Sequence, residues 1–199
     1  MTFCLTLRCA DPHSLMQSIT SARSADPPSP KSSETLDPIP WRARRDLVDA
    51  HFASSHEVLA SLWQGLRCGA QAAGIGIHAE PASALALSRA ALDQTRAGAP
   101  GRMIGVVGPD VELAAAVTAV LGLIQRIRAE RTAAEWRMVD LLVPGVRGQQ
   151  GAVAEALGVT PQAVSKALLR TGWAEELAGR HAAESLLSRL ADTTRPTPE

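Results

Sequence analysis

The segment that most constrains the fold is a helix stop followed at once by a helix start, near residue 158. Gly158 follows Leu157 at a position where helices commonly end in a left-handed residue, a conformation that glycine adopts at low cost. Thr160 is a favourable N-cap, and Pro161 suits the first turn of the next helix because its missing N–H needs no partner there. The pattern predicts two short helices over 149–170, joined by a tight turn.

The two predicted helices need a shared apolar core to hold their crossing angle. Ala154 is small enough for two helix backbones to approach closely. The other residues expected in the core are Val153, Leu157, Val159, Val164 and Leu168. A third helix over 133–142 is predicted to close this core. Its expected apolar face is Ala134, Met138, Leu141 and Leu142, with Trp136 as a large anchor.

These features are typical of a helix-turn-helix, in which the second helix presents its early and solvent-facing residues to the major groove of DNA. Gln162 can make two hydrogen bonds to an adenine edge, and Ser165 can reach a base or a phosphate. The predicted DNA-binding residues are Arg147, Gln149, Thr160, Gln162, Ala163, Ser165, Lys166 and Arg170. We therefore expect a sequence-specific DNA-binding protein, a transcriptional regulator that reads the major groove of double-stranded DNA with the helix 161–171.

The alternative is a protein-interaction adaptor that uses the helical C-terminal domain without direct DNA binding. A DNA-binding protein should expose Arg147, Lys166 and Arg170 together, whereas an adaptor should expose an apolar patch there. Residues 147–173 hold three basic side chains and one acid, a net charge of +2, in a chain whose formal net charge is zero. Since this positive charge is modest, we expect a homodimer or a second contact to be needed for tight binding.

The N-terminal part predicts shorter elements of both kinds. Strands are expected over 1–9 and 103–107, and a hairpin or strand pair over the glycine-interrupted 66–78. Helices are expected over 11–23, 46–63 and 81–96, and a long apolar helix begins near 109. Five prolines lie within 24–40, which is predicted to be an exposed loop. The order strand, helix, strand, strand, helix, strand fits a small ferredoxin-like sandwich.

The predicted fold class is therefore α+β, with a ferredoxin-like α/β sandwich followed by a long helix and an all-helical helix-turn-helix domain. A further helix is expected over 174–191, with no alternating strands after Arg170 that could form a β-hairpin wing. The predicted organisation is a small α+β domain over 1–108 with its Pro/Ser-rich loop at 24–40, a connecting helix over 109–131, a DNA-binding domain over 132–192 and a flexible tail over 193–199.

Other classes of function are disfavoured by the residues that are missing. Cys4, Cys9 and Cys68 are odd in number and lack a CxxC spacing, which predicts buried free thiols rather than disulfides or a zinc site. His51 and His56 lack the spacing and the glutamate of a zinc hydrolase motif, and the glycine pairs match no phosphate-binding loop. We expect no enzyme activity, no cofactor and no metal, and no small-molecule effector can be named.

Targeting features are also missing from the sequence. It has no stretch of 18 or more apolar residues, and its N-terminus lacks the features of a signal peptide. We therefore expect a cytoplasmic location and no membrane partner.

The segment LVPGVRGQQGAVAEALGVTPQAVSKALLRTGW, residues 142–173, resembles the C-terminal half of actinobacterial SatD-like proteins, often described as MarR-type DNA-binding proteins. The resemblance covers about the last two thirds of the chain and implies a bacterial transcription regulator. The GDEF-like segment of the N-terminal half of such proteins is absent here, so no nucleotide-related role is carried over. The winged hairpin of MarR regulators is also absent, so the resemblance implies DNA binding but not the MarR architecture or its phenolic ligands.

Overall fold

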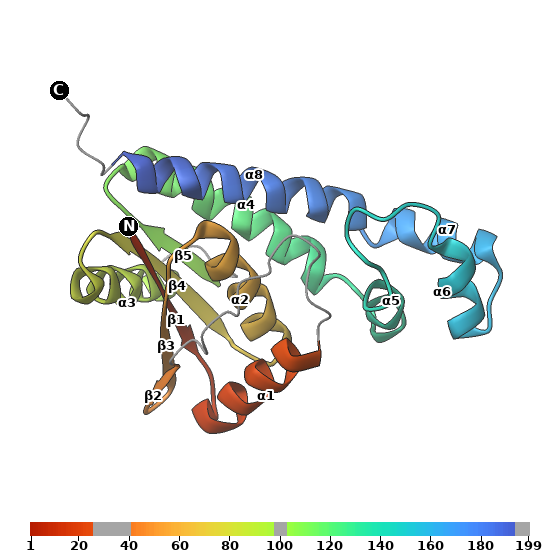
Figure 1. Cartoon of the computed structure of the whole chain (residues 1–199), viewed down its shortest axis with the longest axis horizontal. Coiled ribbons are helices and arrows are strands. Elements are labelled where there is room, and N and C mark those ends of the chain that lie inside the picture. The colour runs from red at the N-terminus through yellow and green to blue at the C-terminus, as the bar shows by residue number, and fades with distance from the viewer. Residues whose placement is uncertain (26–40, 98–102, 194–199) are drawn as a thin grey trace. The chain divides into compact units, whose positions relative to one another are not determined.

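A computed structural model describes residues 1–25, 41–97 and 103–193 of the chain (Figure 1). These residues form one five-stranded sheet and eight helices, a mixed α and β composition as predicted. Of the predicted loop over 24–40 and the predicted tail over 193–199, residues 26–40 and 194–199 lie outside the described residues, whereas residues 24 and 25 belong to a helix. The chain divides into two compact units, a sheet unit of Met1–Ala119 with Glu184–Glu199 and a helical unit of Val120–Ala183.

The sheet has the strand order β2-β3-β1-β4-β5. Its strands are β1 (Thr2–Arg8), β2 (Arg42–Arg44), β3 (Leu47–Phe52), β4 (Ala72–His78) and β5 (Ile104–Val107). β1 is antiparallel to both β3 and β4, β2 is antiparallel to β3, and β4 is parallel to β5. The central strands β1 and β4 are buried along nearly their whole length, so helices must cover both faces of the sheet.

The helices of the sheet unit are α1 (Pro12–Ala25), α2 (Ser55–Arg67) and α3 (Pro81–Ala97), while α4 (Val111–Ala129) and α8 (Trp173–Asp192) each contain a unit boundary. α2 packs against Leu7 at Gly65, and α3 makes a hydrogen bond to Thr6 through Ser88. Since neighbouring residues of a strand point to opposite faces, α2 and α3 cover opposite faces of the sheet, as Figure 1 shows.

α3 lies unusually close to the sheet because glycines face it. A Cβ atom on Gly76 would lie 2.2 Å from the Ala84 carbonyl oxygen and 2.3 Å from the Ser88 nitrogen, both backbone atoms of α3. Gly74 and Gly105 meet the α3 backbone in the same way. Gly74 and Gly76 of β4 therefore allow the close approach of helix and strand.

A chain of polar groups is buried between β1, β3 and α3. The Thr6 hydroxyl donates to Asp49 Oδ1 at 2.7 Å and also forms a 2.7 Å hydrogen bond with the Ser88 hydroxyl. Arg89 Nη2 donates to Asp49 Oδ2 at 2.6 Å. Asp49 is thus buried with both carboxylate oxygens occupied, and it holds Arg89 in place.

Two N-terminal predictions were wrong. Residues 47–52 of the predicted 46–63 helix form β3, where pairing with β1 and the partners of Asp49 outweigh the helical pattern. α2 begins only after Ser54, whose hydroxyl accepts from the Glu57 N–H while Glu57 bonds back to Ser54, a capping box that marks the start. The predicted strand pair over 66–78 is instead the end of α2, a turn at Gly69 and the single strand β4.

The other predicted elements are confirmed. The strands expected over 1–9 and 103–107 are β1 and β5, and the helices expected over 11–23 and 81–96 are α1 and α3. The long helix expected from residue 109 is α4, where the Asp110 carboxylate accepts from the Leu113 N–H at 2.9 Å. The helix expected over 174–191 is α8, so the described residues after Arg170 contain no wing.

The three cysteines are free thiols, as predicted. Cys4 and Cys9 are buried in or beside β1, and Cys68 is half-buried. Burial raises the pKa of the Cys4 thiol to about 11, although a hydrogen bond with Ser88 acts in the opposite direction. Because the thiolate is the nucleophilic form, burial makes Cys4 a poorer nucleophile near neutral pH.

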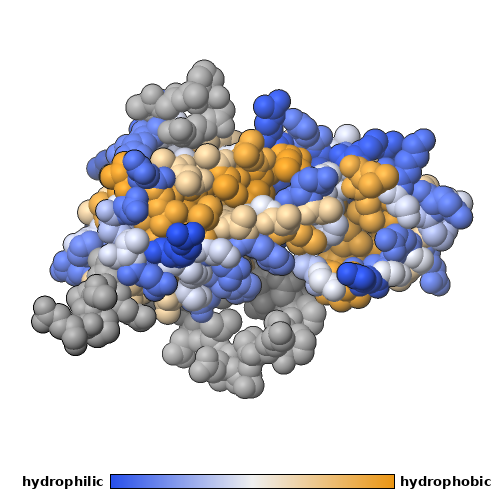
Figure 2. Space-filling model, turned by 90° about the horizontal axis from the view of Figure 1, so that it is seen from above, coloured by the Kyte–Doolittle hydropathy of each residue, from blue (hydrophilic) through white to orange (hydrophobic). Residues whose placement is uncertain are grey.

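Apolar side chains also reach the surface. On α4, Val111 and Leu123 are exposed, and Figure 2 shows orange apolar areas among polar ones on the face seen from above. Single exposed apolar side chains are common on folded proteins and do not by themselves indicate a partner. None of the described helices combines the length and apolar character needed to span a bilayer.

Candidate nucleic-acid interface

The predicted helix stop and helix start are present in the helical unit. α6 (Gln150–Leu157) ends at Gly158, whose φ of 65° and ψ of 35° are left-handed. α7 (Pro161–Arg170) begins after Thr160, whose hydroxyl accepts a hydrogen bond from the Ala163 N–H at 3.2 Å. The two helices are therefore joined by the tight turn that the sequence predicts.

We expect Gly158→Ala to destabilise the helical unit by about 1–2 kcal/mol, because a left-handed residue brings its Cβ close to the following carbonyl oxygen. No other atom lies within 4 Å of the added methyl group, so the loss measures backbone conformation alone. Urea unfolding followed by circular dichroism checks this. Gly151→Ala in α6 is the matched control, since its methyl group is equally free and its φ is not positive. Equal losses in both variants would contradict the explanation.

The predicted three-helix core is present, with exceptions. α5 (Ala133–Val139) begins with a capping box between Thr132 and Glu135. The buried core is Met138, Val153, Ala154, Val164 and Ala167, and Leu142, Leu157 and Leu168 pack against it. α7 contacts both α5 and α6.

Three residues predicted for this core lie at the surface instead. Val159 is 47% exposed and lies in the turn after Gly158, where its backbone N–H donates to the Ala154 carbonyl. Leu141 is 43% exposed because α5 ends at Val139, before it. Ala134 is exposed on α5.

The solvent-facing side of α7 carries five of the predicted DNA-binding residues. Gln162, Lys166 and Arg170 are exposed and follow one another at four-residue spacing, so they lie along one helix face. Ser165 and Ala163 flank this row and are exposed too. The opposite side of α7 is buried at Val164 and Ala167. The core thus fixes which side of α7 faces solvent.

One apolar residue interrupts this polar face. Leu169 is 85% exposed and lies three residues after Lys166 and seven after Gln162, on the same side of α7. The face is therefore neither a purely basic strip nor a purely apolar patch.

The loop before α6 holds the two remaining predicted contacts. Gln149 uses its whole amide inside the loop: its Oε1 accepts from the Val143 N–H at 2.8 Å, and its Nε2 donates to the carbonyls of Val143 and Val146 at 2.8 and 2.9 Å. Gln149 is thus a loop-stabilising residue, and both of its amide N–H donors are already used within the loop. Arg147, between these anchor points, is exposed.

Arg170 lies in the electrostatic field of α5. Hydrogen bonds from the backbone and side chain of Thr132 lower the pKa of Glu135, and the positive charges of Arg170 and Arg131 lower it further. The negative charge of Glu135 therefore partly offsets the positive charge of Arg170. Lys166 has no acidic residue beside it on α7, so on that helix its positive charge is less offset than that of Arg170.

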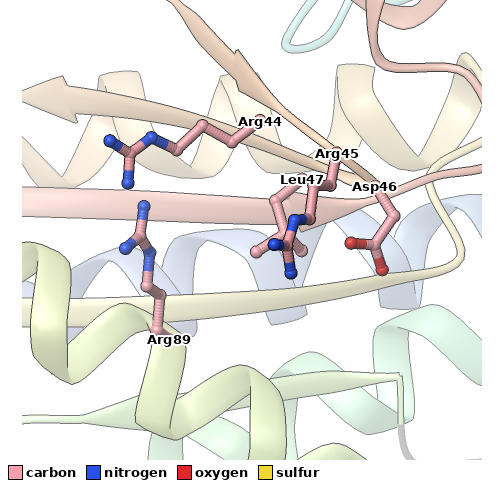
Figure 3. A pocket seen from close by; sticks show the side chains of 5 residues that line it. All are labelled: Arg44, Arg45, Asp46, Leu47 and Arg89. Atoms are coloured by element: carbon pink, nitrogen blue, oxygen red, sulfur yellow. The ribbon is translucent and has the colours of Figure 1, made fainter.

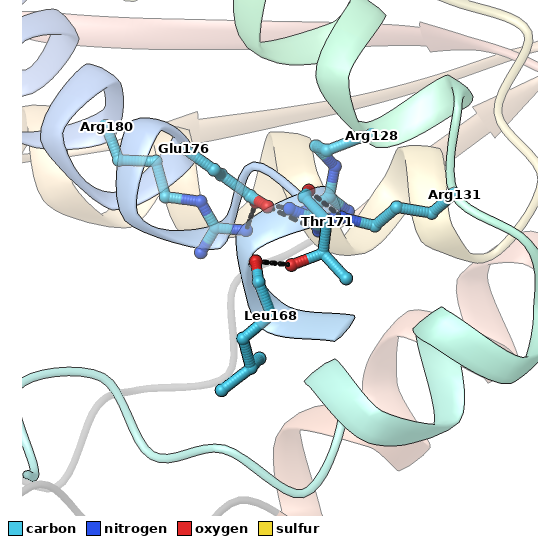
Figure 4. A network of polar contacts seen from close by, with 6 residues as sticks. All are labelled: Arg128, Arg131, Leu168, Thr171, Glu176 and Arg180. Carbon is cyan, nitrogen blue, oxygen red and sulfur yellow. Dashed lines mark hydrogen bonds and ion pairs between the residues drawn. The ribbon is translucent and has the colours of Figure 1, made fainter. Parts of the chain in front are cut away.

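A buried ionic network lies behind the end of α7 (Figure 4). Glu176 of α8 is fully buried and contacts three guanidinium groups. Its Oε1 accepts from Arg128 Nη1 at 2.6 Å and from Arg180 Nη2, and its Oε2 lies 2.5 Å from Arg131 Nη1. Arg131 Nε also donates to the Thr171 carbonyl at 2.8 Å, directly after α7. The network therefore ties the C-terminal end of α7 to α4 and α8 within the helical unit.

The arginines of the network also contact aromatic rings. The guanidinium carbons of Arg128 and Arg131 lie 4.8 and 5.0 Å from the Trp136 ring centroid. Burial lowers the pKa of Arg128, whereas the charge of Glu176 acts to raise it. None of these ionic contacts was predicted from the sequence. The one local signal is the four-residue spacing of Glu176 and Arg180 on α8.

The two histidines considered for a metal site have separate partners. His51 Nε2 donates to the Pro81 carbonyl at 3.1 Å, and His56 Nδ1 lies 3.5 Å from Glu184 Oε1. The structure does not bring the two rings to a common ligand position.

No family model matches this chain, and no curated protein matches it either. The geometry of α5, α6 and α7 is therefore the basis for any functional assignment.

Proposed function

We propose that this chain is a sequence-specific DNA-binding protein that places α7 in the major groove of duplex DNA. The observation that carries the proposal is the exposed face of α7, where Gln162, Ser165 and Lys166 point away from a closed three-helix core and no acid lies on the helix. The resemblance of residues 142–173 to bacterial helix-turn-helix regulators supports the same assignment.

The residues have different roles in this proposal. Gln162 lies in the first turn of α7, the part of a recognition helix that enters the groove, and its amide can pair with both hydrogen-bonding groups of an adenine edge. Lys166 and Arg147 contact phosphates, with Arg170 as a weaker third because of Glu135. Leu169 can contact a thymine methyl group.

We expect Gln162→Ala to cost about 1–3 kcal/mol at one base step and to relax specificity there, because a bidentate base contact is lost. Lys166→Ala should weaken binding to all duplexes and reduce the salt slope by about one, because a phosphate contact is lost. Selection of bound duplexes from a random library, followed by fluorescence-anisotropy titrations at several salt concentrations, measures both effects. Two cooperating copies should select palindromic half-sites about 10 base pairs apart.

Two variants are matched controls for this experiment. Arg137→Ala removes one exposed positive charge from α5, and Gln17→Ala removes an exposed amide from α1. Both should leave affinity and salt slope unchanged. If Arg137→Ala weakens binding as much as Lys166→Ala, the binding is general charge attraction rather than recognition by α7. If no duplex binds in a salt-dependent manner, the proposal is wrong.

The second candidate is a protein-interaction adaptor, which the exposed Leu169 favours. An adaptor would use the apolar centre of the α7 face, so Leu169→Gln should disrupt its complex while Lys166→Ala should have little effect. For a DNA-binding protein the order of the two effects is reversed.

For the sheet unit we infer a ferredoxin-like sandwich with one added unit. The support is the element order β1-α1-β2-β3-α2-β4 together with the antiparallel spatial order β2-β3-β1-β4, to which α3 and the parallel strand β5 are appended. Such a fold hosts many unrelated functions, so its role must be argued from its own side chains.

A further inference from the structure

A cavity of about 510 Å³ opens on the sheet unit beside the β2–β3 turn (Figure 3). Arg44, Arg45, Asp46 and Leu47 of the turn line it on one side, and Arg89 of α3 lines it on the other. Its volume is within the range of small-molecule sites, about 300–1,000 Å³. Three of its five lining side chains are arginines and one is an acid, so the lining carries a net positive charge.

The Arg89 guanidinium is held in this position by a buried group. Asp49 is 4% exposed, and its two oxygens are occupied by Arg89 at 2.6 Å and the Thr6 hydroxyl at 2.7 Å. Asp49 contacts the Arg89 guanidinium through Nη2, and the Arg89 side chain remains about one-third exposed. Arg89 is therefore a pre-oriented cation on a rigid element.

The two arginines of the turn lack comparable partners. In the part of the chain that the structure describes, no ion pair joins Arg44 or Arg45 to an acid. Asp46, the acid beside them, lies 3.6 Å from Arg8. Figure 3 shows the guanidinium groups of Arg44 and Arg89 pointing toward one another. Like charges repel at such positions, and an anion between them removes the repulsion.

The backbone at Arg45, beside the cavity, adopts a left-handed conformation that is unfavourable for arginine. Its φ of 49° is the one positive value at a non-glycine residue within residues 1–25, 41–97 and 103–193. Glycine or asparagine would adopt this conformation at lower cost than arginine does. Strained residues of this kind concentrate at binding sites.

We propose that this cavity binds a small molecule through a phosphate group held by Arg44, Arg45 and Arg89. A guanidinium donates paired hydrogen bonds to phosphate or carboxylate oxygens. A phosphate presents its oxygens in several directions and suits three guanidinium groups from different elements, whereas one guanidinium already satisfies a planar carboxylate. Leu47 contacts an apolar part of the ligand, and Asp46 accepts from its hydroxyl groups. This site is independent of DNA binding by α7.

Calorimetric titration of the full chain with pyrophosphate tests the proposal, with citrate and sodium chloride titrated at equal ionic strength. We expect saturable pyrophosphate binding that is tighter than citrate binding, and at least a tenfold loss of affinity in Arg44→Gln. Arg96→Gln, which removes an exposed charge from α3 outside the cavity, should bind within twofold of the unchanged protein. Arg44→Lys keeps the charge without the paired donors and should fall between these two variants.

Arg45→Gly separates binding from folding. Because glycine adopts the left-handed conformation readily, this variant should unfold at the same or a higher temperature while its pyrophosphate affinity falls at least tenfold. The proposal would be overturned if citrate bound more tightly than pyrophosphate, or if titration with pyrophosphate released no more heat than titration with sodium chloride. It would also be overturned if Arg44→Gln and Arg45→Gly bound pyrophosphate as tightly as the unchanged protein.

Discussion

Glu176→Gln will destabilise the helical unit by about 3–5 kcal/mol, because it removes the negative charge from a buried ionic cluster and leaves its arginines. Glu176 is fully buried and contacts Arg128, Arg131 and Arg180. Glutamine has nearly the same shape, so the loss arises from charge and hydrogen bonding rather than from a cavity. Hydrogen exchange followed by mass spectrometry measures the effect separately for Val120–Ala183 and for the sheet unit.

Glu130→Gln is the matched control, because it makes the same chemical change in the same unit. Glu130 pairs with Arg126 at 3.3 Å, and both side chains are largely exposed. Exposed pairs of this spacing contribute about 0.3–0.5 kcal/mol, so the control should unfold almost like the unchanged protein. Similar protection in the two variants would show that the cluster around Glu176 contributes little to stability.

The same prediction has a pH dependence. Burial by itself would raise the pKa of Glu176, but the charges of Arg180, Arg128 and Arg131 outweigh it, and the pKa lies below its usual value of 4.5. The stabilisation is therefore complete above about pH 4.5 and is lost as the pH falls through the lower folded-state value. The stability difference between the unchanged protein and Glu176→Gln should narrow as the solution is acidified below pH 4.5.

Gly76→Ala will destabilise the sheet unit by about 3 kcal/mol or more, because the added methyl group has no space. It would lie 2.2 Å from the Ala84 carbonyl oxygen and 2.3 Å from the Ser88 nitrogen, and no side-chain rotation can move these backbone atoms. α3 must shift away from β4, which disturbs the Thr6–Ser88 hydrogen bond. Thermal unfolding followed by far-ultraviolet circular dichroism, together with hydrogen exchange of β4, measures the loss.

Gly65→Ala is the control in the same unit. Its methyl group would meet the Leu7 side chain at 2.4 Å, and a side chain can turn aside where a helix backbone cannot. Alanine also favours the interior of α2 by about 1 kcal/mol, which offsets part of the strain. We expect a smaller loss than in Gly76→Ala. Losses of equal size would show that close approach of the α3 backbone is not what makes Gly76 necessary.

The parts of the fold that were predictable from sequence depend on local signals. Gly158, Thr160 and Pro161 act on their own backbone and nearest neighbours, so their effects can be read from adjacent residues. The same kind of signal was present at Ser54 and Glu57, a capping box that places the start of α2. The helical pattern over 46–63 concealed it, because apolar residues of a strand buried on both faces carry no strict alternation.

The candidate sites depend more on contacts between distant residues. Arg128 and Glu176 are separated by 48 positions, and Asp49 and Arg89 by 40. No periodicity relates such residues, so the ionic cluster and the arginine-lined cavity became visible only in the folded chain. Gln149 shows that residue type alone can also mislead. Glutamine suits a base contact, but the Gln149 amide makes hydrogen bonds to Val143 and Val146 within the loop.

Ionic strength will separate the two kinds of charge in the helical unit. The carboxylate of Glu176 is out of reach of dissolved ions, so salt barely weakens its pairing with the arginines. Lys166 on the open face of α7 is surrounded by solvent, and a phosphate contact made there is weakened by counterions. If α7 binds DNA as proposed, raising the salt concentration from about 50 to 200 mM should weaken the complex while the protein stays folded. A salt titration of this chain would therefore test the proposed DNA contacts without loss of structure.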